Sequence, residues 1–272
     1  MMQPAPIELK KIWGCERWLA STHPNGTQPD FAAALGGGYP LLVKIIQADD
    51  RLSVQVHPDD RAAAQLEGAE CRGKTECWYV LDAEPGARLI SGFSHACSAG
   101  ELEAAVRNGT VAALLEEVPV ARGDFVFIPA GTVHAIGAGM RLLEVQQSCD
   151  TTYRLYDWGR GRELHIEKAL RVARRERSPG AAPFPGSFSC EYFSLERLDV
   201  RGGWSMRASG ERAPESWQLL FVLEGSGAIT DCATGGRLAL APEQLHAVAP
   251  GDKITVEGTL SLLRIRCGRH DG

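Results

Sequence analysis

Four side chains in the first half of the chain have the chemistry of ligands for a divalent metal. Gln55 and His57 are two positions apart in "LSVQVHPDD", so on a β-strand they share one face. Glu76 opens the strand-like run "ECWYVLDA", and His134 follows a Pro-containing turn in "IPAGTVHAIG". Two imidazoles, a carboxylate and an amide oxygen can hold a divalent cation and leave a position for water. Such an open position is typical of a catalytic metal.

Further ionisable residues accompany these ligands. Lys74 precedes Glu76 by two residues, and Glu144 lies in "RLLEVQQ", the next strand-like run after His134. Taken singly, a strand histidine is more often a hydrogen-bonded structural residue, and a Lys–Glu pair usually lies on the surface. Polar residues recur, however, on one face of strands whose other face is apolar, and this arrangement favours a site. Ser53 shares the face of Gln55 and is a candidate substrate contact, or a hydroxyl bonded to backbone.

The elements that must position these residues are mostly short β-strands. They are rich in branched and aromatic residues and are bounded by Gly, Pro or Asp. In the first half they are "PLLVKIIQA", "LSVQVH", "ECWYVLDA", "ARLISGF", "DFVFIPA" and "RLLEVQQS". This spacing of strands and turns predicts a mainly β fold built as an antiparallel sandwich or barrel.

A small helical insertion interrupts the strands around residues 98–118. Ser98 and Glu101 form a predicted capping box, and Asn108-Gly109 ends the first helix. A second helix is predicted to begin at Val111 and run to Glu117. We expect this insertion to be a brace or lid without chemistry of its own.

The chain is predicted to contain two β-rich domains in succession. Residues 1–160 form the catalytic domain, and residues 161–186 combine the helical run "HIEKALRVARRERS" with the Pro/Gly-rich linker "PGAAPFPGSF". Strands resume in residues 187–272. In this half His246 stands alone, without the further ligands that a metal needs, so we expect a domain that binds no metal.

Composition restricts the function classes. The chain has 272 residues, of which 44% are hydrophobic and 23% charged, as in an ordinary globular protein, and its net charge of -5 provides no basic field for nucleic acid. No apolar run has membrane-spanning length, and the first residues lack a secretion signal. We therefore expect a cytoplasmic monomer or weak homodimer without membrane or nucleic-acid partners. The scattered cysteines are expected to be reduced, and most of them to be small core residues: Cys15, Cys71, Cys77, Cys97, Cys149, Cys190, Cys232 and Cys267.

Longer motifs resemble one known family. "GDFVFIPAGTVHAIG" resembles the second cupin motif, although Ala138 stands where that motif has Asn. The larger set resembles the short bacterial form of the type I phosphomannose isomerases. It comprises "KIWGCERW", "PLLVKIIQADDRLSVQVHPDD", "GKTECWYVL" and "IPAGTVHAIGAGMRLLEVQQSCDTTYRLYDWGR", which run in order to Arg160. Two positions depart from the family pattern: Thr75 stands where Pro is frequent, and Cys15 where Gly is common.

The resemblance implies a fold and a set of roles. It implies two cupin (jelly-roll) β-sandwich domains and one Zn²⁺ per chain. The family's zinc ligands fall on Gln55, His57, Glu76 and His134, and its active-site residues on Lys74, Glu144 and Arg154. The implied reaction interconverts mannose 6-phosphate and fructose 6-phosphate through an enediol. Arg154 is our choice for positioning the substrate, and either it or a loop lysine would hold the phosphate. Either Lys74 or Glu144 would be the carbon base, with the alternative that Glu144 only orients a ligand.

Two rival functions stay open at this point. The first is another cupin enzyme, either a different sugar isomerase or an iron-dependent dioxygenase. Oxygenases prefer shells of His and carboxylate, so Gln55 argues against the dioxygenase. The second is a cupin sugar sensor without catalysis. The joint presence of Lys74, Glu144 and Arg154 argues against it, because a sensor does not need proton-transfer groups.

Overall fold

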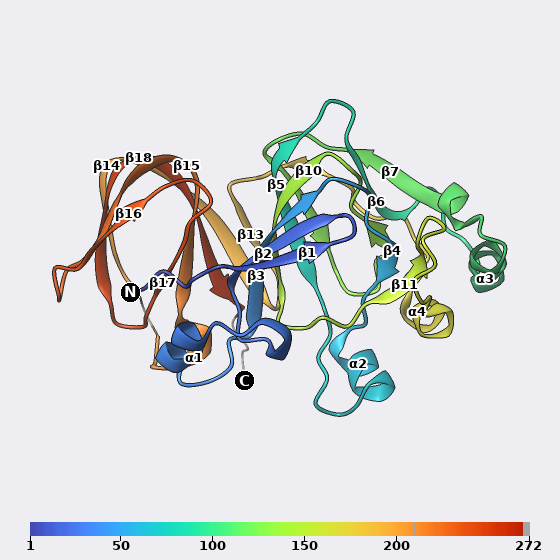
Figure 1. Cartoon of the computed structure of the whole chain (residues 1–272), viewed down its shortest axis with the longest axis horizontal. Coiled ribbons are helices and arrows are strands. Elements are labelled where there is room, and N and C mark those ends of the chain that lie inside the picture. Colours follow the sequence, from blue (N-terminus) through green and yellow to red (C-terminus); the bar gives the residue numbers. More distant parts are fainter. Residues whose placement is uncertain (209, 269–272) are drawn as a thin grey trace. The chain divides into compact units, whose positions relative to one another are not determined.

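Three antiparallel sheets account for most of the computed structural model, which describes residues 1–208 and 210–268. The seven-stranded sheet has the order β1 (Ile7–Lys11), β2 (Gly14–Ala20), β3 (Leu41–Ala48), β10 (Met140–Gln147), β5 (Glu76–Ala83), β8 (Asp124–Ile128) and β12 (Ala182–Pro183). The five-stranded sheet has the order β11 (Tyr153–Tyr156), β4 (Val54–Val56), β9 (His134–Ala135), β6 (Arg88–Phe93) and β7 (Leu115–Pro119). The predicted mainly β fold is confirmed (Figure 1).

The third sheet lies in the C-terminal part of the chain. Its order is β13 (Ser187–Ser189), β14 (Phe193–Arg207), β18 (Lys253–Cys267), β15 (Gln218–Asp231) and β16 (Arg237–Leu240), with β17 (Leu245–Val248) also paired to β15. The helices are α1 (Pro29–Leu35), α2 (Asp60–Leu66), α3 (Ala99–Arg107) and α4 (Ile166–Val172). Short 3-10 turns are η1 (Pro24–Gly26), η2 (Val111–Leu114) and η3 (Pro214–Ser216). No helix of the described ranges has the length and apolar character needed to cross a membrane.

The chain divides into two compact units that interleave along the sequence. One unit comprises Met1–Ile7, Trp18–Val43 and Pro185–Gly272, and the other comprises Glu8–Arg17 and Lys44–Phe184. The segments predicted from the sequence (1–160, 161–186 and 187–272) follow one another and do not describe this interleaving. All of the residues proposed above as ligands or catalytic groups belong to the second of these units.

The helical insertion is partly as predicted. Ser98 caps α3, and its side chain and that of Glu101 form the expected capping box. The predicted second helix is wrong: the chain makes the turn η2 and then continues as strand β7. Val118 of β7 pairs with Leu89 of β6, so sheet pairing overrides the helical pattern of the alanines before it.

The run after His165 also differs from the prediction. Helix α4 ends at Val172, and the following arginines are extended, with Arg174 bridged to Thr132 and Arg177 to Gly92. The Pro/Gly-rich stretch contributes the short strand β12, which pairs with β8. Backbone pairing with the sheets therefore replaces both the end of the predicted helix and part of the predicted linker.

Strand β4 has one apolar face and one polar face. Val54 and Val56 are fully buried in a cluster that includes Leu102 of α3 and Ala169 of α4. The helical insertion and α4 therefore cover the outer face of the five-stranded sheet. Gln55, between the two valines, points to the opposite face of the sheet.

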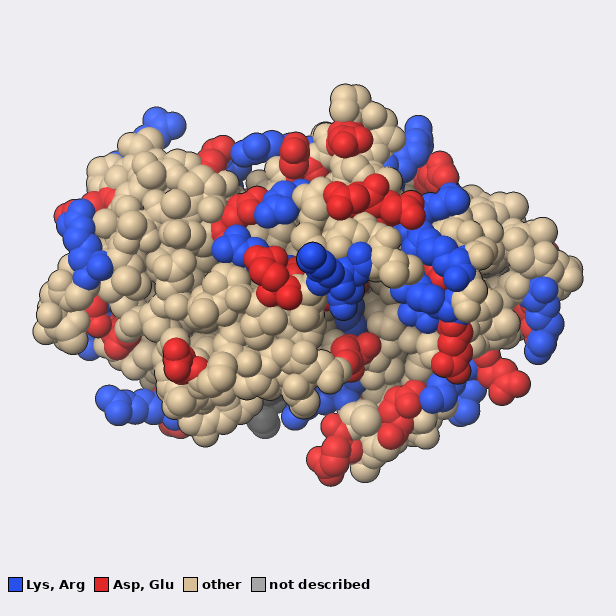
Figure 2. Space-filling model, viewed as in Figure 1, with Lys and Arg blue, Asp and Glu red and all other residues tan. Residues whose placement is uncertain are grey.

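Charged groups are mixed over the surface. On the face drawn in Figure 2, acidic and basic side chains lie interspersed, in keeping with the modest net charge of -5.

His246 on β17 is a buried histidine of the C-terminal sheet. Its side chain is fully buried, and neither ring nitrogen has a hydrogen-bond partner among the described residues. Burial lowers the pKa of His246 from 6.5 to about 4. The imidazole is therefore neutral in the folded protein above that pH.

We predict that His246→Leu stabilises the protein at pH 7 by about 1–3 kcal/mol, because it removes two unpaired buried nitrogens. The unfolded chain protonates His246 below 6.5 and the folded chain only near 4, so stability falls as the pH drops through this interval. The variant should lose about 3 kcal/mol less stability than the parent over this interval. Denaturant unfolding at several pH values measures this difference, and identical pH profiles would contradict it.

Candidate functional site

The predicted ligands converge between the two sheets of the second unit. Gln55 pairs with His134 on neighbouring strands β4 and β9, and Arg154 of β11 pairs with Gln55 on its other side. Directly paired residues share a face, so these three side chains form one row on the inner face of the five-stranded sheet. Glu76, the first residue of β5, comes from the seven-stranded sheet.

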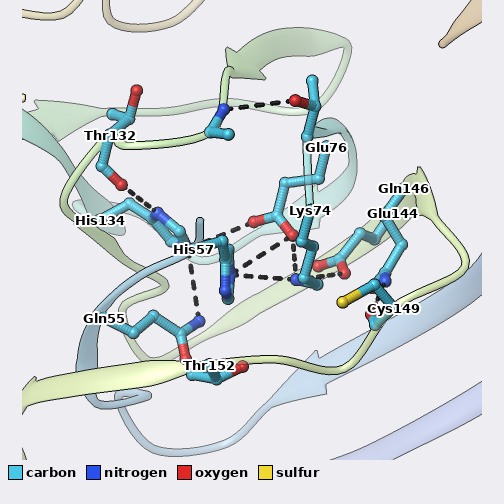
Figure 3. Close-up of polar contacts among 12 residues, drawn as sticks. Gln55, His57, Lys74, Glu76, Thr132, His134, Glu144, Gln146, Cys149 and Thr152 are labelled. Atoms are coloured by element: carbon cyan, nitrogen blue, oxygen red, sulfur yellow. Dashed lines mark hydrogen bonds and ion pairs between the residues drawn. The ribbon is translucent and has the colours of Figure 1, made fainter. Parts of the chain in front are cut away.

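His57, Glu76 and His134 form a buried triad. Their ligand atoms all lie within 4.8 Å of one another, and each side chain is at most 1% exposed. Glu76 Oε1 is 3.2 Å from His134 Nε2, and Glu76 Oε2 is 3.7 Å from His57 Nε2. In Figure 3 dashed lines run from the Glu76 carboxylate toward both rings.

Backbone carbonyls determine which nitrogen each histidine turns toward Glu76. Nδ1 of His57 lies 2.9 Å from the Thr151 carbonyl, and Nδ1 of His134 lies 2.8 Å from the Thr132 carbonyl. A carbonyl only accepts, so each Nδ1 donates to it, and Nε2 is the nitrogen that faces the site. This second contact is the one that metal-binding histidines usually make.

Gln55 completes the group of four. Its amide nitrogen is 3.4 Å from His134 Nε2, and its side chain is half-buried. Rotation of the amide exchanges its nitrogen and oxygen, so the oxygen can face the same point as the imidazoles. The structure thus brings together all four residues that the sequence suggested as ligands.

Lys74 lies against the triad. Its ammonium donates to Glu76 Oε2 in a short contact and lies 3.1 Å from His57 Nε2. The ammonium also forms an ion pair with Glu144, whose Oε1 is 3.5 Å away. Lys74 therefore holds a positive charge beside the atoms that would ligate a cation (Figure 3).

Hydrogen bonds to the backbone hold the Lys74–Glu76 segment in place. The amide of Thr75 donates to Gln147 Oε1, and the Thr75 hydroxyl accepts from the Ala130 amide. Gln147 in turn donates to Asp60, which also accepts from the Gly73 amide. Thr75, which stands where the family frequently has Pro, therefore forms hydrogen bonds through both its backbone and its side chain.

Glu144 is the centre of a second buried group, part of which sequence reasoning missed. Its Oε1 is 3.1 Å from Lys44 Nζ, and its Oε2 accepts from the Trp78 indole at 3.0 Å. Lys44 also reaches Glu16 at 3.3 Å. The only signal for Lys44 in the sequence was a cation in the otherwise apolar run "PLLVKIIQA", which predicts that it must be paired inside the protein.

The charges of these groups follow from their neighbours. Burial, and then the charge of Lys74, lower the pKa of His57 well below its usual value, so this ring is neutral. Burial raises the pKa of Glu76, but the positive charge of Lys74 outweighs it, and the net pKa is well below normal. Burial lowers the pKa of Lys44, but Glu144 and Glu16 outweigh it and raise the pKa above its normal value. Lys44 is therefore a permanent cation and Glu76 a permanent anion.

The positions of Arg154 and Ser53 give weaker support for their predicted roles. Arg154 lies in the row beside Gln55, but its Nη1 donates to the Glu163 carbonyl at 2.7 Å, while its buried Nε has no partner among the described residues. Burial, and then the charge of Arg162, lower the pKa of Arg154. Ser53 is buried next to strand β4. The catalytic role of Arg154 and the substrate contact of Ser53 stay predictions.

The triad suits a divalent metal. Two imidazole nitrogens, one carboxylate and an adjacent amide are the usual donors for such an ion. Glu76 Oε1 is buried yet accepts no hydrogen bond among the described residues, so it keeps a lone pair for a cation. The chemistry of this donor set fits the metal that the sequence suggested.

Comparisons with known proteins point to one family. Residues 9–78 match the profile described as "Phosphomannose isomerase type I, catalytic domain". The mannose-6-phosphate isomerase of Streptococcus mutans is 37% identical over 303 residues, covering 92% of this chain and 90% of the relative. Mannose-6-phosphate isomerase ManA of Bacillus subtilis is 38% identical and covers 80% of this chain and 69% of its own.

Two solved structures resemble the whole chain. The crystal structure of mannose 6-phosphate isomerase from Bacillus subtilis superposes with a TM-score of 0.83 at 28% identity, covering 97% of this chain and 100% of that one. An Archaeoglobus fulgidus structure, described as a putative mannosephosphate isomerase, has a TM-score of 0.80 at 22% identity and shows the shared fold.

Proposed function

Because the chain belongs to the type I phosphomannose isomerase (mannose-6-phosphate isomerase) family, we propose that it interconverts mannose 6-phosphate and fructose 6-phosphate. The convergence of His57, Glu76 and His134 beside Lys74 carries this proposal, because it combines a metal donor set with a proton-transfer group. The reaction moves a carbonyl between two neighbouring carbons. One carbon loses a proton and the other gains one, through an enediol.

The chain supplies a full donor set for one Zn²⁺. Gln55, His57, Glu76 and His134 would hold the ion, which supplies a Lewis acid for the substrate oxygens. Glu76 is the single carboxylate of this set, so the site would keep a positive charge with the metal bound. A positive site stabilises the negative charge that develops on the enediolate.

Lys74 and Glu144 are positioned for proton transfer. The ammonium of Lys74 and the carboxylate of Glu144 are 3.5 Å apart and both are buried. Direct proton transfer needs heavy atoms within about 2.6–3.2 Å, or one bridging water, so a small movement of the Lys74 side chain would bring this pair into range. The pair would exchange the substrate proton, and Lys44 would hold Glu144 in place as a fixed cation.

Arg154 would position the substrate and stabilise charge on its oxygens. Its place beside Gln55 in the inner row supports this role, because a guanidinium binds oxyanions with paired hydrogen bonds. Ser53, on the loop that leads into β4, would add a hydroxyl contact.

We extend the proposal to the form of the protein in the cell. The chain would have two cupin sandwiches, of which the C-terminal one binds no metal, and it would act in the cytoplasm as a monomer or weak homodimer. Its substrate would be a small sugar phosphate, without nucleic-acid or membrane partners. The absence of a basic field in a chain of net charge -5 supports this expectation.

A coupled assay tests the reaction. Purified protein should convert mannose 6-phosphate and fructose 6-phosphate into each other, whereas free mannose should react far more slowly. In deuterated water the product should carry solvent deuterium on the carbon that receives the proton. Oxygen uptake in place of isomerisation would favour a dioxygenase, and sugar-phosphate binding without turnover would favour a sensor.

A further inference from the structure

Trp78 connects the two buried groups of the site. Its indole N–H donates to Glu144 Oε2 at 3.0 Å, and its ring packs edge-on against His134 with centroids 5.4 Å apart. We propose that Trp78 is a positioning residue that holds the Glu144 carboxylate in the orientation needed for proton exchange with Lys74. This inference rests on the proposed isomerase function.

The Glu144 carboxylate has one hydrogen-bond donor, the Trp78 indole, and two ion-pair partners, Lys44 and Lys74. Lys44 and Lys74 both approach Oε1, at 3.1 and 3.5 Å, whereas Oε2 receives the Trp78 indole. Glu144 is only 2% exposed, so water offers little replacement. Without the indole N–H, the carboxylate can turn about its terminal bond, and Oε1 no longer has a fixed distance to Lys74.

Strand pairing places the side chains of Trp78 and Glu144 next to each other. The two residues are direct partners on β5 and β10, so their side chains leave the sheet side by side on one face. Trp78 is fully buried, and an indole has one donor and no acceptor. Its N–H is therefore committed to Glu144, and the packing against His134 holds the ring in that orientation.

Trp78→Phe tests this role, because it removes the donor and keeps an aromatic ring in the core. Trp13→Phe is the matched control: Trp13 is also buried and belongs to the same hydrophobic cluster as Trp78. We expect Trp78→Phe to lower kcat about 10- to 100-fold with KM within about twofold of the parent, as for other groups that orient an active residue. Trp13→Phe should keep kcat within about twofold.

A loss of packing alone predicts a different pattern. It would lower the melting temperature of both variants and leave their kcat values similar, and that result would overturn the inference. If Trp78→Phe does not fold, a benzothienylalanine at position 78 keeps the shape of the indole with sulfur in place of N–H. If the benzothienylalanine variant had the kcat of the parent, the positioning role of Trp78 would also be overturned. A parent protein without any isomerase activity would instead refute the proposed function.

Discussion

His134→Ala is expected to abolish stoichiometric metal binding and to lower kcat by about 1,000-fold or more, because a ligand and the Lewis acid it holds are lost together. His134 is fully buried, lies 3.2 Å from Glu76 Oε1 and pairs with Gln55 across the sheet. No neighbouring histidine of the triad can replace its Nε2, since His57 presents its own. Elemental analysis of metal per chain and the coupled assay measure the two effects.

The control for this variant is a second buried histidine. His246 lies on β17 of the other unit and is as buried as His134. His246→Leu should retain the parent's metal content and turnover. A His134→Ala protein that keeps one metal per chain and a kcat within about tenfold of the parent would contradict the ligand assignment.

Arg154→Ala is expected to keep the metal but lower kcat by about 100- to 1,000-fold, the range for removal of a group that stabilises developing charge. Arg154 shares the inner face with Gln55, and its half-buried guanidinium has an unpartnered Nε among the described residues. Metal content, kcat and KM are measured together, so that a loss of substrate positioning is separated from a loss of metal.

Arg107→Ala provides the control for the arginine. Arg107 ends helix α3 and pairs with the exposed Glu103 on the same helix, so its removal should leave turnover unchanged. A fully active Arg154→Ala variant would show that the catalytic arginine has been misplaced. The arginines after β11, such as Arg162, would then be the next candidates.

That the proposed ligands lie close together could be predicted in part from the sequence, because strand periodicity determines which side chains share a face. Gln55 and His57 share a face two residues apart, and a turn delivers His134 to the next strand. What periodicity could not show was which strands face each other. The approach of Glu76 from the other sheet is set by sheet packing, which single segments do not reveal.

The supporting groups were harder to predict for the same reason. Lys44 and Trp78 occur in apolar strands, where a core role is the ordinary expectation, and only the strand order places both against Glu144. The helix expected from Val111 became strand β7 because pairing with β6 outweighed local helical preference. The interleaved units likewise depend on long-range pairing that no local pattern shows.

The most direct test of the central claim is a metal titration of the stripped protein. Chelation should remove the ion from His57, Glu76 and His134 and abolish isomerisation while the fold persists. Added Zn²⁺ should then restore activity in proportion to bound metal, with saturation at one ion per chain. Full isomerase activity in protein shown by elemental analysis to be free of metal would contradict the account.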